Sequence, residues 1–541
     1  MLFLGLDLSS QGLKAIVLED DLSVKSEFSV NFDGDLPEYG TRGGALFGEN
    51  GSAFSPTIMF VEAVDKLLHG LVAIGVNLAE VGALSASGQQ HGSVYWASGS
   101  AEKLKQLNPE LELVPQLGNG FSVKQSPIWM DASTAKYCAA LEAAAGGAAN
   151  LASETGSKAF RRFTASQIWK IKDKDPATFA ATQRISLISA FIVSVFLQKF
   201  APEDSSDASG TNLIDLRSDP PQWSTKMLDI VSPKLREKLC SAPVDSFALL
   251  GNIGEYFQRR YGFSGSCRVV AAAGDNPCSA AGMLMREDAD LCVSLGTSDT
   301  AFMLSSTATP RADVGSIYRN PLKRLSYMPM VVYTNGSLTR ESARDYDGKA
   351  RSWTEFEDLI KSVPKGNNGI VGFYLPRPEI APETNGDVSR YFNECGNSVE
   401  DSEISLGTRC RAALEMRALA IRYHTTCLGM SKPVRIVATG GGSSSPSMIQ
   451  ILADVLQCPV YVSPTVNSAG LGAAYRAFHA VQCEAADGGF VDFSASISSK
   501  KDVESDRVLE ASPDSHSKAT YDNLYTNYIR CEKLVLEDQR A

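Results

Sequence analysis

The sequence contains few of the residues that build metal centres and disulfide frameworks. Its 541 residues include only five histidines, and its 11 cysteines are scattered without a C-x-x-C pair. This spacing argues against a zinc site and against a disulfide framework, and it is typical of reduced thiols. Reduced thiols and the absence of a recognisable targeting segment favour a cytoplasmic location.

An excess of positive charge and a long hydrophobic run are also missing. Lysine and arginine total 51 against 62 aspartates and glutamates, a net charge of −11. This balance argues against nucleic acid and anionic membranes as partners. The strongest apolar segment, residues 185–200, is short for a membrane span and is interrupted by serine and glutamine, so we expect a buried helix there.

A chain of 541 residues is too long for a single hydrophobic core, so at least two domains are expected. We predict an N-terminal domain over residues 1–274 and a C-terminal domain over residues 275–483. Residues 484–541 are expected to form a linker rich in serine and aspartate, followed by a terminal helix that docks back on the body.

Two similar hairpins are predicted, one near the start of each half of the chain. Residues 2–18 and residues 291–304 each read as two apolar strands around a small, hydroxyl-rich turn. Successive N–H groups in such turns can bind phosphate oxygens, although ordinary β-turns have the same composition. The candidate phosphate-binding residues are Ser9, Ser10, Gln11 and Lys14 in the first hairpin and Gly296, Thr297 and Ser298 in the second.

Two further features fit a bound nucleotide. Asp7 ends the first strand and could hold Mg²⁺, mostly through water. In residues 434–460 a strand runs into Gly440–Gly442, and Pro446 then opens a helix. This is no P-loop, because the lysine is absent, but the glycines would let a flat adenosine approach closely. A plain strand–helix corner is the alternative interpretation.

The segment 268–282 places a carboxylate at the end of a predicted strand. An apolar run stops at Gly274, Asp275 and Asn276 follow, and Pro277 opens an alanine-rich helix with Asn276 as its expected N-cap. Asp275 could accept a proton from a bound hydroxyl, or it could only help to cap the helix. An ordinary aspartate with a pKa near ~4 would be ionised at neutral pH.

Polar and aromatic residues cluster in three segments of the first half, residues 87–93, 126–134 and 160–164. Aromatic faces, amides and a few charges are the mixture that binds a sugar. A histidine beside glycines is more often satisfied by the backbone, so no member of the cluster carries the interpretation alone. The candidate sugar-binding residues are Gln90, His91, Asp131 and Arg162.

Taken in order, these motifs resemble those of the FGGY carbohydrate kinases over roughly residues 2–480. The motifs that carry the resemblance are DLSSQGLKA, SGQQHGS, WMDAST, GDNP, SLGTSDT and ATGGGSS. The resemblance implies an α/β fold of two actin- or hexokinase-like (ribonuclease H-like) domains that face each other across a catalytic cleft. It also implies ATP-dependent phosphorylation of D-xylulose on its 5-hydroxyl, with Mg²⁺. We expect a monomer or a homodimer.

The resemblance also assigns roles to single residues. Asp275 matches the general base. The residues that match sugar contacts are His91, Arg162, Asp275 and Asn276, and those that match nucleotide contacts are Trp353, Gly440 and Gly441. Relatives often carry asparagine where this chain has Ser445, so Ser445 is a candidate adenosine contact that departs from the pattern.

Three alternatives remain open at this stage. A related kinase could act on ribulose, glycerol or another polyol, because a few hydroxyl contacts decide specificity. A non-catalytic sugar or nucleotide sensor could share the fold. Against it, the chain keeps Asp275 and both hydroxyl-rich turns, of which a degraded kinase would be expected to have lost at least one. A chaperone-type ATPase would leave the sugar-like cluster without a purpose.

Overall fold

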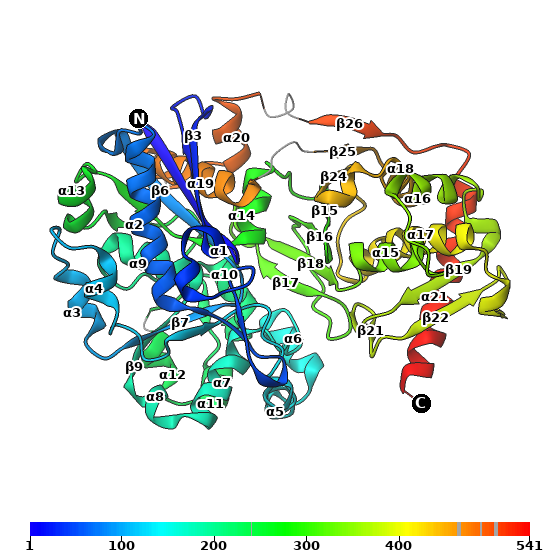
Figure 1. Ribbon diagram of the computed structural model, residues 1–541, viewed down its shortest axis with the longest axis horizontal. Helices are drawn as coiled ribbons and strands as arrows, with labels where there is room; N and C mark the ends of the chain where they lie inside the picture. The colour runs from blue at the N-terminus through cyan, green and yellow to red at the C-terminus, as the bar shows by residue number, and fades with distance from the viewer. Residues whose placement is uncertain (240, 463–466, 487–488, 503–506, 541) are drawn as a thin grey trace. The chain divides into compact units, whose positions relative to one another are not determined.

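The computed structural model describes residues 1–541 except 240, 463–466, 487–488, 503–506 and 541 (Figure 1). The chain forms two compact α/β units. Each unit is assembled from separated stretches of sequence: Met1–Leu284, Tyr318–Ser326 and Thr465–Val503 form the first, and Met285–Ile317, Tyr327–Pro464 and Glu504–Ala541 form the second. The boundaries differ from the continuous ranges 1–274, 275–483 and 484–541 expected from sequence, because residues 275–284 and 465–503 belong to the first unit.

The first unit is built on a mixed sheet with the strand order β12-β13-β6-β1-β2-β3. Strand β1 pairs antiparallel with β2 and parallel with β6, so the predicted hairpin at residues 2–18 is confirmed. All seven residues of β1 are buried, as expected for a central strand covered on both faces. The strands are β1 (Leu2–Leu8), β2 (Gly12–Leu18), β3 (Val24–Asn31), β6 (Val81–Gly88), β12 (Leu249–Asn252) and β13 (Arg268–Val270), and β14 (Ala273–Gly274) also pairs with β6.

Helices cover this sheet with unusually close contacts. Helix α19 (Ser468–Ala485) packs on β1 and β6 and also on α14 (Asp275–Gly282). A Cβ on Gly5 would lie 2.5 Å from the backbone nitrogen of Ala474, and one on Gly282 would lie 2.9 Å from that of Gly472. Glycine is therefore required at these positions, because the backbones of the strand and the two helices nearly touch.

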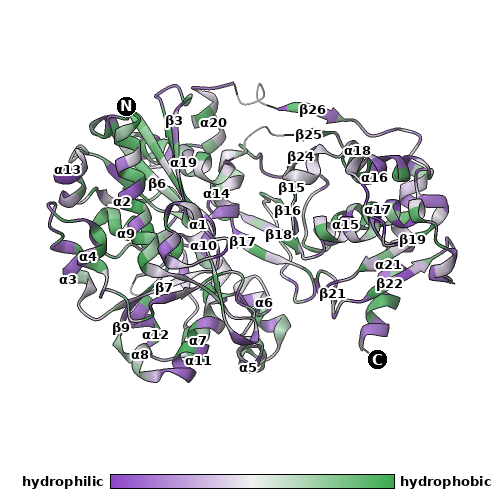
Figure 2. Ribbon diagram, in the orientation of Figure 1, coloured by the Kyte–Doolittle hydropathy of each residue, from purple (hydrophilic) through white to green (hydrophobic). Residues whose placement is uncertain are grey.

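The apolar segment 185–200 is only partly the buried helix that we expected. Its first residues belong to strand β9 (Thr182–Leu187), and helix α9 occupies Ile188–Leu197. All ten residues of α9 are buried, and the helix is drawn almost wholly in the hydrophobic colour in Figure 2. In the part of the chain that the structure describes, no helix is long and apolar enough to cross a membrane.

The second unit repeats the strand pattern of the first. Strand β15 pairs antiparallel with β16 and parallel with β24, which in turn pairs parallel with β25. The sheet order is β17-β18-β16-β15-β24-β25-β26, with an antiparallel strand at the end beside β25, as beside β13 in the first sheet. The predicted duplication of the fold is therefore confirmed. The strands are β15 (Asp290–Leu295), β16 (Asp299–Met303), β17 (Ser316–Arg319), β18 (Tyr327–Tyr333), β24 (Arg435–Thr439), β25 (Val460–Val462) and β26 (Val508–Ala511).

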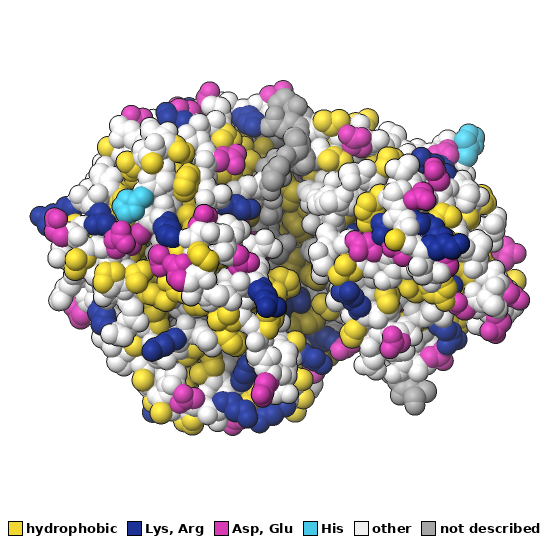
Figure 3. Space-filling view, viewed as in Figure 1, with side chains coloured by type: hydrophobic (Ala, Val, Ile, Leu, Met, Phe, Trp, Pro, Cys, Tyr) yellow, Lys and Arg dark blue, Asp and Glu magenta, His cyan; other side chains and the backbone are white. Residues whose placement is uncertain are grey.

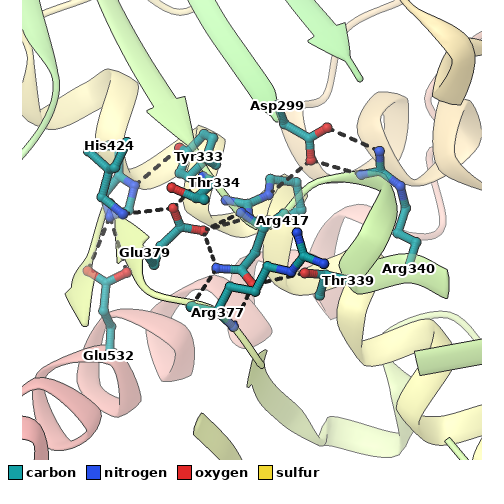
Figure 4. Close-up of polar contacts among 12 residues, drawn as sticks. Asp299, Tyr333, Thr334, Thr339, Arg340, Arg377, Glu379, Arg417, His424 and Glu532 are labelled. Atoms are coloured by element: carbon teal, nitrogen blue, oxygen red, sulfur yellow. Dashed lines mark hydrogen bonds and ion pairs between the residues drawn. The ribbon is translucent and has the colours of Figure 1, made fainter. Parts of the chain in front are cut away.

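The predicted terminal helix is present as α21 (Lys518–Arg540). It buries Leu524, Tyr528, Cys531 and Val535, which lie at helical spacing. The helix contacts α17 (Leu406–Cys427), and His424 Nε2 of that helix lies 3.1 Å from Glu532 Oε2 (Figure 4). The preceding residues 484–518 are not a plain linker, because they contain α20 (Phe493–Ser498) and β26.

Candidate active site

The first hydroxyl-rich turn, between β1 and β2, is concave and polar. Ser9 closes the turn by donating to the carbonyl of Gly12 from its backbone nitrogen at 3.0 Å and from its Oγ at 3.1 Å. A cavity of about 350 Å³ lies over the turn. The cavity is lined by Ser9, Ser10, Gln11, Gly12, Lys14, Ser29, Val30 and Asn31, so the four candidates from this hairpin are neighbours.

The second hydroxyl-rich turn lies next to the glycine-rich turn within the second unit. Strands β15 and β24 are parallel neighbours, with Ser294 opposite Thr439, so the turns that follow them come off the same edge of the sheet. Gly440 has a φ of +81°, and a Cβ on it would lie 2.6 Å from the carbonyl oxygen of Leu295. Only glycine fits this approach between the two turns.

Ser445 begins helix α18 (Pro446–Leu456) and is already engaged. Its Oγ accepts a hydrogen bond from Met448 N at 3.2 Å and donates to Glu357 Oε1 at 2.5 Å. The serine therefore caps α18 and ties it to α16 (Trp353–Lys361). A contact between Ser445 and adenosine stays a prediction.

Trp353 presents an exposed aromatic face near this corner. It stands four residues before Glu357 on α16, so both side chains lie on one face of the helix. The indole is 47% exposed, and the guanidinium of Arg344 lies 4.7 Å from its ring centroid. Glu357 thus ties α16, the helix that carries Trp353, to the start of α18 within the second unit, and the assignment of Trp353 to the nucleotide stays a prediction.

Asp275 lies where β14 ends and helix α14 begins. The register pairs Gly274 with Gly88 of β6, and the N-cap is Gly274 in an extended conformation. Our prediction of Asn276 as the N-cap is wrong, because the helix starts earlier. The Asp275 carboxylate accepts the backbone N–H of Asn276 at 2.8 Å, which satisfies a donor of the first turn.

The carboxyl group of Asp275 is electrostatically unusual. Burial, and then the negative charge of Asp7, raise its pKa from 3.8 to about 7. Our expectation of an ordinary pKa near ~4 is therefore wrong. The two aspartates approach because Asp7 and Ala273 both stand opposite Ser87, on the two strands that flank β6.

Asp7 has a buried carboxylate oxygen that is available to a metal ion. Burial raises the pKa of its carboxyl group, and its Oδ1 is buried without a hydrogen-bond partner among the described residues. The described residues include no cluster of three or more histidine, cysteine, aspartate or glutamate side chains that could hold a metal. Mg²⁺ bound to one carboxylate, water and phosphate oxygens agrees with both observations.

His91 and Arg162 come together around one phenylalanine. The imidazole of His91 stacks on Phe163 with the ring centroids 4.4 Å apart, and Arg162 lies 6.0 Å from the same ring. His91 Nδ1 is 2.9 Å from the carbonyl of Gly210, so Nδ1 carries the proton and Nε2 is an acceptor. Burial, and then the charge of Arg162, lower the pKa of His91 to about 3, which keeps the ring neutral.

Gln90 connects the sugar cluster to Asp275. Its Oε1 accepts a hydrogen bond from Asn276 Nδ2 at 2.9 Å. Its Nε2 is buried and has no hydrogen-bond partner among the described residues. A buried, unpaired amide donor next to a carboxylate is the kind of group that a polar ligand satisfies.

Asp131 is occupied by protein donors. Its carboxylate accepts hydrogen bonds from Ala53 N at 3.2 Å, Ser133 N at 2.9 Å and Gln167 Nε2 at 2.9 Å. Ser133 Oγ and Lys170 Nζ add two further contacts, at 2.5 and 3.3 Å. The assignment of Asp131 to the sugar stays a prediction, and the structure gives the side chain a role in holding its own loop.

Asp207 is a buried carboxyl group that the sequence analysis did not single out. Its Oδ2 accepts from Ser189 Oγ at 2.5 Å, and its Oδ1 has no partner among the described residues. A Cβ on Gly274 would lie 2.7 Å from that Oδ1, so Asp207 lies directly against the backbone before Asp275. The segment that begins with Asp207, DASGTNLIDL, shows no chemical pattern in the sequence, because the burial of Asp207 is a property of the folded chain.

Charged side chains of both signs lie on the face of the molecule that Figure 3 draws. Figure 3 shows lysine and arginine interspersed with aspartate and glutamate on the face that it presents. A surface of this kind does not resemble the basic patch that binds nucleic acid.

Two units with the same strand pattern, each with a hydroxyl-rich hairpin turn, define the actin- and hexokinase-like class of α/β kinases. Within this class, the chain belongs to the FGGY family of carbohydrate kinases. Residues 120–282 match the N-terminal domain of that family, and residues 291–481 match its C-terminal domain.

Known proteins resemble the chain over nearly its full length. It is 42% identical to a xylulose kinase of Rattus norvegicus, covering 99% of this chain and 98% of that protein. It is 40% identical to xylulose kinase 2 of Arabidopsis thaliana, covering 99% and 97% respectively. The crystal structure of a xylulose kinase from Rhodospirillum rubrum superposes with a TM-score of 0.80 at 17% identity and covers 100% of both chains, which shows the fold.

Proposed function

We propose that this carbohydrate kinase transfers the γ-phosphoryl group of ATP to the 5-hydroxyl of D-xylulose. The products are D-xylulose 5-phosphate and ADP. The relatives at 40–42% identity support this substrate, since both are described as xylulose kinases. The observation that carries the proposal is the Asp275 carboxyl group, which lies between Gln90, Asn276 and Asp7 and has a pKa of about 7.

Asp275 serves as the general base in this proposal. A pKa of about 7 leaves the carboxyl group partly ionised at neutral pH and strengthens it as a proton acceptor. The sugar oxygen forms its bond to the γ-phosphorus as the bond from that phosphorus to the departing ADP oxygen breaks. The hydroxyl proton moves to the Asp275 carboxylate during this step.

The sugar is held by groups of the first unit. Neutral His91 accepts a hydrogen bond from a hydroxyl through Nε2, and Arg162 donates to a sugar oxygen. The unpaired Nε2 of Gln90 supplies a further donor next to Asp275. Asn276 orients Gln90 and contacts the sugar from the same side.

The nucleotide is held by the turns. Backbone N–H groups of Ser10 and Gln11 and of Thr297 and Ser298, together with Lys14, bind phosphate oxygens in this proposal, while the N–H groups of Ser9 and Gly296 close their own turns. Trp353, Gly440 and Gly441 contact adenosine. Asp7 would hold Mg²⁺, which neutralises phosphate charge when it is bound.

Two other predictions remain part of the proposal. A cytoplasmic location stays the expectation, because the scattered spacing of the cysteines is typical of reduced thiols. A monomer or a homodimer stays the expected assembly.

A kinase for ribulose or glycerol remains the second candidate, because the described contacts recognise hydroxyl groups without selecting among such sugars.

The test is an ADP-release assay with D-xylulose, D-ribulose, L-ribulose, L-xylulose and glycerol as separate acceptors. We expect the highest kcat/KM with D-xylulose, and a higher value with another acceptor would refute the substrate assignment. Asp275→Asn should lower kcat by about 10²-fold to 10⁴-fold. The matched control is Asp175→Asn, another carboxylate at a helix start, where Asp175 caps α8 (Pro176–Ala181) and lies outside the site.

A further inference from the structure

Two of the three turns assigned to the nucleotide, those at residues 296–298 and 440–442, lie beside one buried side chain, Arg340. It lies on α15 (Ser337–Arg344), and its side chain is 8% exposed. Its Nη2 donates to the carbonyl of Gly296 at 3.2 Å and lies 3.4 Å from the position of a Cβ on Gly442. The guanidinium group therefore hydrogen-bonds to the hydroxyl-rich turn and lies close to the glycine-rich turn.

Arg340 also holds both ends of the hydroxyl-rich turn. Asp299, the first residue of β16, directly follows the turn. Its Oδ2 accepts from Arg340 Nη1 at 2.8 Å and its Oδ1 accepts from Nη2 at 3.1 Å (Figure 4). The planar guanidinium group of Arg340 thus binds Gly296 at the start of the turn and Asp299 just after it, with a geometry that a lysine cannot reproduce.

The orientation of this guanidinium group is itself fixed by a buried ionic network. Asp299 Oδ2 also lies 3.3 Å from Arg417 Nε, and Arg417 Nη2 donates to Glu379 Oε2 at 3.1 Å (Figure 4). Glu379 accepts the backbone N–H of Thr334 at 2.6 Å, in the segment between β18 and α15. The start of α15 closes the arrangement, because Ser337 N donates to the carbonyl of Gly296 at 2.9 Å.

We propose that Arg340 is a positioning residue for the phosphates of the nucleotide. It fixes the N–H groups of the turn at residues 296–298 and the spacing of this turn from the turn at residues 440–442. The inference rests on the proposed function, in which these turns bind ATP. A buried ion pair often adds little net stability compared with apolar packing, so the expected benefit is a defined turn geometry.

The test compares Arg340→Lys with a matched control, Arg411→Lys. Arg411 forms a similarly buried ion pair with Glu415 in the same unit, with side chains 8% and 2% exposed, and is assigned no part in the site. Arg340→Lys should raise the KM for ATP about tenfold, because small displacements of phosphate-binding groups are costly. Its KM for the sugar should stay close to the wild-type value, and Arg411→Lys should leave both constants unchanged.

Asp299→Asn is a second variant that keeps the shape of the side chain and leaves Arg417 paired with Glu379. It should also raise the KM for ATP and weaken ADP binding measured by calorimetry. Unchanged ADP affinity and KM for ATP in folded Arg340→Lys would overturn the inference, as would an equal effect of Arg411→Lys. If the wild-type protein bound ADP but phosphorylated no sugar, the proposed function would fail, and the calorimetric comparison would still decide the role of Arg340.

Discussion

Asn276 directs two hydrogen-bond donors to the same oxygen of Asp275. Its backbone nitrogen lies 2.8 Å and its Nδ2 lies 3.1 Å from Asp275 Oδ1. The Nδ2 group also donates to Gln90 Oε1, so the amide cannot rotate without losing both contacts. One oxygen of the base is therefore held in place by the residue that follows it.

Replacing this amide by a carboxylate should change the pH at which the base works. Asn276→Asp would put a second negative charge beside Asp275 and raise the pKa of the pair further. The acid limb of the kcat/KM profile should move to higher pH, and it should move less in Asn276→Ala, which removes the Nδ2 donor to Asp275 but adds no charge. Profiles of the two variants that coincide in shape would contradict the prediction.

The wild-type enzyme should lose activity on the acid side of neutrality. The proposed base is active when ionised, and the pKa of Asp275 is about 7. Below that pH, kcat/KM for the sugar should fall about tenfold per pH unit. A profile that stays flat well below pH 7 would show that another group accepts the proton, and the Asp175→Asn control should reproduce the wild-type curve.

The same carboxyl group should lower the stability of the fold at neutral pH. The pKa of Asp275 is raised in the folded state, so the folded protein binds more protons than the unfolded chain between pH 3.8 and about 7. Stability therefore decreases as pH rises through this window and levels off above it. Asp275→Asn removes the ionisation, so its Tm should exceed that of the wild type by a margin that grows across the window.

His91 should act on the sugar and not on the nucleotide. Its ring is neutral across the working range, because its pKa is lowered to about 3, and its Nε2 is a hydrogen-bond acceptor. His91→Phe keeps an aromatic ring on Phe163 but removes the acceptor, so the KM for the sugar should rise about tenfold or more while the KM for ATP stays constant. His516→Asn, at an exposed position, is the control. An equal rise in both constants would point to a general loss of structure.

Periodic apolar strands and turn composition were sufficient to predict the hairpins at residues 2–18 and 291–304 and the corner at residues 434–460. The N-cap of α14 was predicted wrongly because local preference favoured Asn276, whereas Gly274 takes the extended cap conformation in the structure. The raised pKa of Asp275 was not predictable, since it depends first on burial and then on the charge of Asp7. Asp7 stands 268 positions earlier in the chain but only two strands away in the sheet. Arg340 and Asp207 were missed because burial and ion pairing are properties of the folded chain.

The close packing of α19 against β1 and α14 also has a consequence for synthesis on the ribosome. The strand that carries Asp7 is among the first segments translated, and the helix that carries Asp275 follows midway. Strand β1 and helix α14 both pack on α19, residues 468–485. The backbone of α19 fills the space beside Gly5 and Gly282. The first unit therefore leaves the ribosome without α19 and completes its fold only near the end of translation. A nascent or truncated chain that stops before residue 468 would expose the apolar surface that α19 covers to chaperones and proteases.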